Sequence, residues 1–169
     1  MMSVFQKIIA MLFLRAAPED LPYNRSLAIQ LGFFYWFSGI VVLKTTLEPS
    51  WLMESMSLSL AILLVFVYAV LRIFHFQLRF VQTFSAIVGV AILFNLASWP
   101  LLSMVADTSN KESLLATVSF MFLMLISWEV LVKAHIFKHA LQISMLNALL
   151  LSFSLFFITM TLSQLLFPA

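Results

Sequence analysis

An uninterrupted apolar run decides the fold class: the sequence reads LAILLVFV from Leu60 to Val67. A strand of a membrane β-barrel would alternate apolar and polar side chains over about 10 residues, and this run does not alternate. The chain also holds only 3 glycines for the turns that a barrel needs. The run therefore favours an α-helix that is apolar on all sides, as in a helix surrounded by lipid.

The composition extends this interpretation to the whole chain of 169 residues, of which 63% are hydrophobic and 9% are charged. Soluble domains carry about 25% charged residues, and a soluble domain of this length could not bury so much apolar surface. The composition thus excludes a soluble enzyme, a nucleic-acid-binding protein and a disordered regulator. The absence of cysteine excludes a disulfide scaffold, a thiol nucleophile and a Cys-ligated metal.

Five segments are long and apolar enough to cross a membrane, which takes about 20 residues at about 1.5 Å per residue. The sequence predicts them at residues 26–43, 56–76, 80–106, 113–137 and 140–167. Polar breaks separate them at residues 45–50, 75–79, 107–112 and 138–139. We expect an all-α, polytopic membrane helix bundle, with a transmembrane domain over residues 26–169 whose first helix is capped by Asn24 or Ser26.

The basic residues divide unequally between the two sides that five spans define. Two of them, Lys44 and Lys111, lie on one side. The other side, which also holds the N-terminus, carries Lys7, Arg15, Arg25, Arg72, Arg79, Lys133 and Lys138. Because Lys and Arg accumulate in cytoplasmic loops, the sequence predicts an integral protein of the bacterial inner membrane with a cytoplasmic N-terminus and a C-terminus outside.

Residues 1–25 precede the first span and contain an amphipathic helix and a proline-bracketed turn. On a helical wheel, one side is a narrow polar stripe and the other is apolar. The polar stripe holds Ser3, Gln6, Lys7 and Ala10, and the apolar side holds Val4, Phe5, Ile8, Met11 and Leu12. This pattern predicts a helix in the cytoplasmic interface, with a cleaved signal peptide as the alternative. Pro18 and Pro22 then end the helical segment.

The turn between the two prolines carries two carboxylates, Glu19 and Asp20, just before the aromatic ring of Tyr23. One interpretation, which the sequence favours, is that these carboxylates neutralise Arg15 or Arg25. The other interpretation is that they form a cytoplasmic docking point for a partner.

Glu129 is the sharpest candidate for function, because an ionisable group at membrane depth is costly. Lys133 follows four residues later, the favourable order for an ion pair on one helix face, and Arg72 near the inner end of the second span is an alternative partner. The functional interpretation is a carboxylate that binds a proton or a cation. The structural interpretation, which we favour, is an ion pair that locks helices together near the inner interface.

Two further polar features lie in the third and fourth spans. Asn95 and Pro100 combine a mid-membrane amide with a residue that lacks a backbone donor and can kink the helix. Broken helices line substrate sites in some transporters, although packing is the more common role. His135 and His139 are four residues apart, a spacing that suits two imidazoles on one metal. No third ligand has a fixed spacing, so we favour interfacial polar residues and predict no metal site and no cofactor.

Catalytic motifs do not occur in the sequence, which has no Gly-rich phosphate loop, no GxSxG and no HExxH. We therefore expect a non-enzymatic scaffold or assembly subunit of a membrane complex. Its expected partners are the lipid bilayer and either another membrane protein or further copies of itself. A small oligomeric transporter or channel that uses Glu129, Asn95 and the Pro100 break is the second hypothesis. A lipid-modifying enzyme is disfavoured, because such enzymes cluster histidines and carboxylates at the interface.

The segment from Arg15 to Tyr23 reads RAAPEDLPY and fits the pattern R-A-x-P-E-D-L-P-Y. In this turn and in the amphipathic helix before it, the chain resembles small uncharacterised bacterial inner-membrane proteins. Its cytoplasmic N-terminal segment, five closely spaced helices and almost absent C-terminal tail also resemble the Yip1-like family of membrane proteins. The Asp-Leu-Tyr-Gly-Pro type motif of the eukaryotic members is lacking. The resemblance implies a five-helix membrane bundle and transfers no functional residue.

Overall fold

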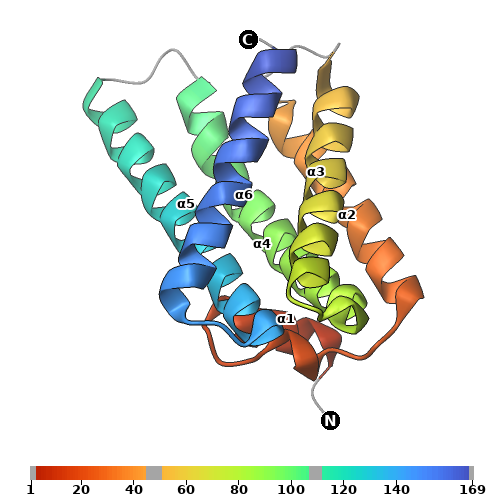
Figure 1. The fold of residues 1–169 in the computed structure, drawn as a ribbon. Helices are drawn as coiled ribbons and strands as arrows, with labels where there is room; N and C mark the ends of the chain where they lie inside the picture. Colours follow the sequence, from red (N-terminus) through yellow and green to blue (C-terminus); the bar gives the residue numbers. More distant parts are fainter. Residues whose placement is uncertain (1–2, 45–50, 107–111, 168–169) are drawn as a thin grey trace.

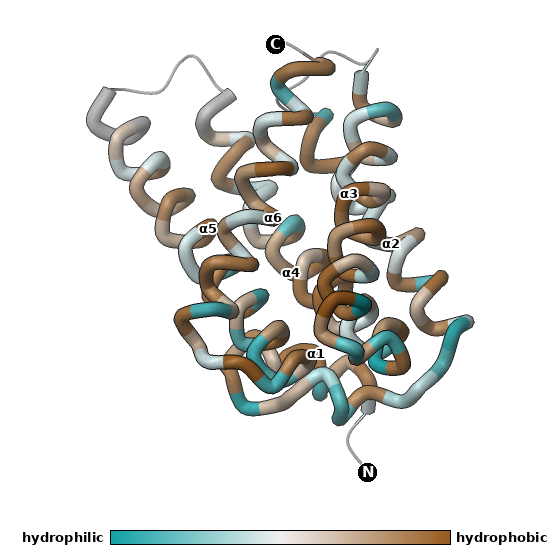
Figure 2. The backbone as a smooth tube through the Cα atoms, in the orientation of Figure 1, coloured by the Kyte–Doolittle hydropathy of each residue, from teal (hydrophilic) through white to brown (hydrophobic). Residues whose placement is uncertain are grey.

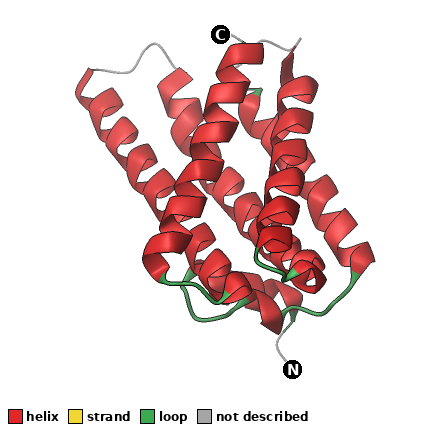
Figure 3. Cartoon of the chain, viewed as in Figure 1, coloured by secondary structure: helices red, strands yellow, loops and turns green. Residues whose placement is uncertain are grey.

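The computed structural model describes residues 3–44, 51–106 and 112–167, which form helices and turns and no strand (Figure 3). The α-helices of this part are α1 (Val4–Leu12), α2 (Arg25–Leu43), α3 (Leu52–Ile73), α4 (Phe80–Ala106), α5 (Glu112–Leu141) and α6 (Met145–Leu166). Two short 3-10 helices, η1 (Pro18–Asp20) and η3 (Gln77–Arg79), precede α2 and α4. The expected all-α bundle is confirmed.

Helices α2 to α6 are each long and apolar enough to cross a membrane, which makes the chain an integral membrane protein. α4 is the central helix, since 61% of its most apolar stretch is buried inside the protein, against 28% or less for the other four. α2 and α5 pack along different sides of α4, and α6 packs against α5 and α3 (Figure 1). α1 lies at the end of the bundle where α2 and α4 begin (Figure 1).

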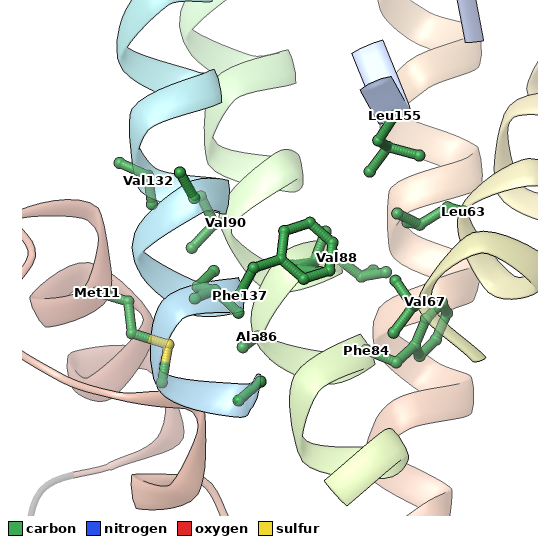
Figure 4. Packing of buried hydrophobic residues seen from close by; sticks show 14 of the residues in the cluster. Met11, Leu63, Val67, Phe84, Ala86, Val88, Val90, Val132, Phe137 and Leu155 are labelled. Carbon is green, nitrogen blue, oxygen red and sulfur yellow. The ribbon is translucent and has the colours of Figure 1, made fainter. Parts of the chain in front are cut away.

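The core of the bundle is built from interlocking apolar side chains of α3, α4, α5 and α6 (Figure 4). Phe137 of α5 is fully buried, and its ring meets Phe66 of α3 edge to face with 6.1 Å between the ring centroids. Val88 of α4 and Leu155 of α6 are buried in the same cluster. Because lipid is as apolar as these side chains, close packing rather than exclusion of water holds the helices together.

The boundary predicted between the last two spans is wrong. Residues 138–139, the expected break, lie inside α5, which continues to Leu141. Lys138 and His139 occupy the last turn, where cationic side chains suit the negative end of the helix dipole. Their polarity therefore marks the end of the helix rather than a loop. Gln142 makes the turn instead, with a left-handed backbone (φ 56°).

Two other spans are shifted. α3 starts at Leu52 and ends at Ile73, before the predicted residues 56 and 76 respectively. α6 starts at Met145, after the predicted residue 140. Ser144 sets the start of α6, because its hydroxyl accepts a hydrogen bond from the Asn147 N–H at 3.3 Å. α2 and α4 agree with the predicted spans to within one residue, and Asn24 caps α2. The break predicted at residues 45–50 lies outside the described residues, as do residues 107–111 of the break predicted at 107–112. Glu112, the last residue of that predicted break, begins α5.

α1, the expected amphipathic helix, also packs against the bundle. Ser3 and Gln6 form a capping box at its start. Ile8 and Met11 are buried against the bundle, whereas Phe5, predicted on the same apolar side, stays 61% exposed. The apolar side of the helix thus faces partly the bundle and partly outward. It does so at the end of the bundle where hydrophilic residues gather (Figure 2).

Candidate functional site

The Glu129–Lys133 ion pair is present on α5, with 2.6 Å between Lys133 Nζ and Glu129 Oε1. Both side chains are largely buried, with 20% of Lys133 and 26% of Glu129 exposed. Arg72, the alternative partner, is exposed on α3 and pairs with no carboxylate of the described residues. The Glu129 charge is therefore balanced within its own helix.

The ion pair lies next to the place where α5 holds the end of α1. Trp128, adjacent to Glu129, donates a hydrogen bond from Nε1 to the Leu12 carbonyl at 3.1 Å. Tyr35 of α2 lies within electrostatic range of the Glu129 carboxylate. Because α5 continues to Leu141, Glu129 lies about 18 Å from the end of the helix by helical rise, deeper than the predicted span implies.

Side chains of α4 and α5 hold the N-terminal segment, residues 3–24, by its backbone carbonyls. His135 Nε2 lies 3.2 Å from the Ala16 carbonyl oxygen, and Gln82 Nε2 donates to the Leu21 carbonyl at 2.7 Å. Carbonyls outside helices need such partners where water is scarce. His135 therefore contributes to docking this segment.

Glu19 and Asp20 form no ion pair with Arg15 or Arg25, so that prediction is wrong. Asp20 Oδ2 accepts a hydrogen bond from the Ala17 N–H at 2.8 Å, which closes the turn of η1. A short acidic side chain commonly bonds a backbone N–H of its own turn. The Ala17 N–H is therefore closer to the Asp20 carboxylate than any arginine, and the Glu19 carboxylate lies beside Arg79.

Arg79 is the partner of Glu19 and connects three elements. Its Nη1 lies 3.8 Å from Glu19 Oε2 and also donates to the carbonyls of His139 and Ala140, each at 3.2 Å. The guanidinium stands 4.9 Å from the centre of the Phe76 ring, a cation–π distance. Arg79 thus satisfies carbonyls in the last turn of α5. No spacing in the sequence reveals this role, because the partners are 60 residues away along the chain.

Asn95 joins α4 to α2. Its Nδ2 donates to Ser38 Oγ at 3.1 Å, and Ser38 Oγ donates to the Tyr35 carbonyl at 3.0 Å. Pro100 does not end the helix, since α4 continues through this residue to Ala106. Neighbouring helices and hydroxyl side chains allow a transmembrane helix to accommodate a proline.

A small cavity of about 180 Å³ lies between α2, α3, α4 and α6, with Asn95 in its wall. Ser55 and Ser59 line it from α3, and Thr159 and Ser163 line it from α6. The hydroxyls of Ser55 and Ser163 are 3.4 Å apart. On each helix the two residues are four apart and share a face. That spacing is the sequence signal for this polar cluster, which contains none of the charged candidate residues.

His135 and His139 lie together on α5, with 4.5 Å between their ring centroids. In the part of the chain that the structure describes, no group of three or more His, Cys, Asp or Glu side chains could hold a metal ion. The His135 ring contacts the Ala16 carbonyl of the N-terminal segment, and the His139 carbonyl accepts a hydrogen bond from the Arg79 side chain.

We expect Asn95→Leu to lower the free energy of unfolding by about 1 kcal/mol, because interhelical hydrogen bonds in membranes are worth roughly 0.6–1.7 kcal/mol. Ser38→Ala should cost a similar amount, and the double variant should cost little more than either single variant. Unfolding in sodium dodecyl sulfate, followed by circular dichroism, measures these values. Fully additive losses would show that the two side chains do not interact.

No protein-family model, curated protein or solved structure matches the chain. The fold and the site define the class of protein on their own. The chain is a polytopic α-helical membrane protein whose N-terminal segment is docked on α4 and α5. A more specific function has to be inferred from the arrangement of its polar side chains.

Proposed function

We propose that the chain is a non-enzymatic scaffold or assembly subunit of a membrane complex in a bacterial inner membrane. The observation that carries this proposal is how the polar side chains inside the bundle are used. Glu129 pairs with Lys133, and Asn95 donates to Ser38. The first contact neutralises a charge within one helix and the second joins two helices. Such contacts favour a rigid frame for partners over a path for ions.

The proposal places the N-terminus in the cytoplasm. Arg25, Arg72 and Arg79 lie at the end of the bundle that carries α1, and Lys44 lies at the opposite end (Figure 1). Positive charge accumulates on the cytoplasmic side of membrane proteins. The proposal takes the bacterial inner membrane from the sequence resemblance of residues 15–23 to small bacterial inner-membrane proteins. Alkaline phosphatase fused to the C-terminus should be active, and an inactive fusion that is stably expressed would contradict this orientation.

Purification in a mild detergent tests the scaffold role. We expect the chain to retain at least one other membrane protein at a reproducible stoichiometry, detected by mass spectrometry of the purified sample. A helical membrane protein of similar size, expressed and purified in the same way, is the control for chance association. A clean homo-oligomer without partners would count against a scaffold.

A small oligomeric transporter or channel is the second candidate. The polar cavity beside Asn95, with hydroxyls from α3 and α6, is the observation that favours it. In such a protein Glu129 would exchange a proton or a cation during transport.

Glu129→Gln separates the two candidates, because it removes the charge and keeps the shape. For a scaffold, we expect the variant to leave ion flux in proteoliposomes unchanged and to weaken retention of the partner. Loss of flux with intact assembly would overturn the scaffold and support the transporter. Lys133→Arg keeps the ion pair and serves as the matched control.

A further inference from the structure

An apolar groove with a volume of about 760 Å³ runs between α2, α3 and the start of α4. On α2 its wall contains two small residues, Ala28 and Gly32, which are four apart and share a face. Leu60, Leu64 and Tyr68 repeat the same spacing on α3. The groove therefore follows both helices for about 12 Å from the end of the bundle toward its middle.

Aromatic rings of α4 form the floor of the groove. The rings of Phe80 and Phe84 stack with 5.8 Å between their centroids, and Tyr68 meets Phe80 edge to face. A Cβ atom placed on Gly32 would lie 3.7 Å from the Phe84 ring, an ordinary contact distance. A larger side chain at position 32 would extend into the groove and narrow it at this level.

The end of the groove nearest α1 is polar, where Tyr23, Arg25 and Gln77 line it. The lining contains no acidic residue. Arg25 is exposed and makes no ion pair with a described carboxylate, in contrast to Arg79 and Lys133. A positive charge without a counterion at the mouth of an apolar groove complements a ligand with an anionic head and an apolar tail.

We propose that this groove binds one anionic phospholipid, with its phosphate at Arg25 and an acyl chain along Gly32 and Phe84. The groove opens to the surface of the bundle beside Ile29 and Phe33, which are 73% and 62% exposed. A lipid can therefore enter it from the bilayer. Basic pockets between transmembrane helices recognise anionic head groups. The site is separate from the Glu129–Lys133 pair and requires neither the scaffold nor the transporter role.

Native mass spectrometry of the full chain in detergent tests the head group. Phosphatidylglycerol and phosphatidylcholine with identical acyl chains are the probes. We expect phosphatidylglycerol to be retained preferentially and Arg25→Gln to reduce its binding about fivefold, with phosphatidylcholine binding unchanged. Arg72→Gln is the matched control, because Arg72 is an exposed arginine at the same end that does not line the groove. Equal binding of the two lipids, or equal losses in both arginine variants, would overturn the proposal.

Larger side chains placed in the groove test whether the acyl chain binds there. Gly32→Leu should reduce binding of both lipids, whereas Ala97→Leu, at an exposed position of α4 outside the groove, should not. Leu64→Trp fills the groove from the opposite wall and replaces Gly32→Leu if that variant does not fold. Retention of both lipids in a folded variant with a filled groove would show that they bind elsewhere. Glycerol phosphate should not compete with the lipid; if it competes fully, the site binds phosphate alone and the proposal is wrong.

Discussion

Gly89→Leu should release α1 from the bundle. Gly89 of α4 faces α1, and a Cβ atom placed on it would lie 2.8 Å from Ile8 Cδ1 and 3.1 Å from Ile8 Cγ1. Ile8 is 5% exposed, so it has little room to move. Overpacking of this kind costs about 1–3 kcal/mol, and here the cost falls on a helix of only nine residues.

A single introduced cysteine measures the release, because the chain has no native cysteine. Met11 is fully buried, so Met11→Cys should react slowly with a maleimide. A loss of about 2 kcal/mol in docking should raise the reaction rate roughly thirtyfold in the Gly89→Leu background.

Two further variants separate release of α1 from general damage to the fold. Ile8→Ala should restore slow labelling in the Gly89→Leu background, because it makes room for the new side chain. Gly32→Ala should have no effect, since the added Cβ meets Phe84 at an ordinary contact distance of 3.7 Å. Slow labelling of Met11→Cys in the Gly89→Leu variant would mean that α1 does not rest on Gly89.

Docking of α1 also marks the limit of what the sequence could predict. The five spans follow from composition and length alone, and residue type limits the cap of the first span to Asn24 or Ser26, of which the structure uses Asn24. The Glu129–Lys133 pair was predictable because its partners are four residues apart on one helix. In each case the information is local. The contact of Ile8 with Gly89 is not, because it depends on which helices become neighbours.

The errors have the same origin. Lys138 and His139 have the polarity of a loop, but contacts from Arg79 and from the Ile143 N–H to the carbonyls of this turn hold it as part of α5. Glu19 was assigned to arginines near it in sequence, whereas its partner Arg79 is brought close by the packing of η1 on α4. Predicting such contacts requires the helix order around α4. Charge and periodicity of a single chain do not contain that order.

Lys133→Met should destabilise the protein by about 2 kcal/mol. The substitution leaves the Glu129 carboxylate without its ammonium partner at 2.6 Å, in a position where only 26% of the side chain is exposed. Removing one partner of a fully buried pair costs about 3–5 kcal/mol, and the partial exposure here lowers that figure. Unfolding in sodium dodecyl sulfate measures the loss.

The reverse substitution should be milder, because the two charges differ in reach. In Glu129→Gln the unpaired ammonium of Lys133 can extend along its four-carbon stem toward the interface, whereas a carboxylate on a short stem cannot. The double variant Glu129→Gln/Lys133→Met removes both charges and should recover most of the stability lost in Lys133→Met. If the double variant is as unstable as Lys133→Met, the cost comes from lost packing of the lysine stem, and the ion pair does not stabilise α5.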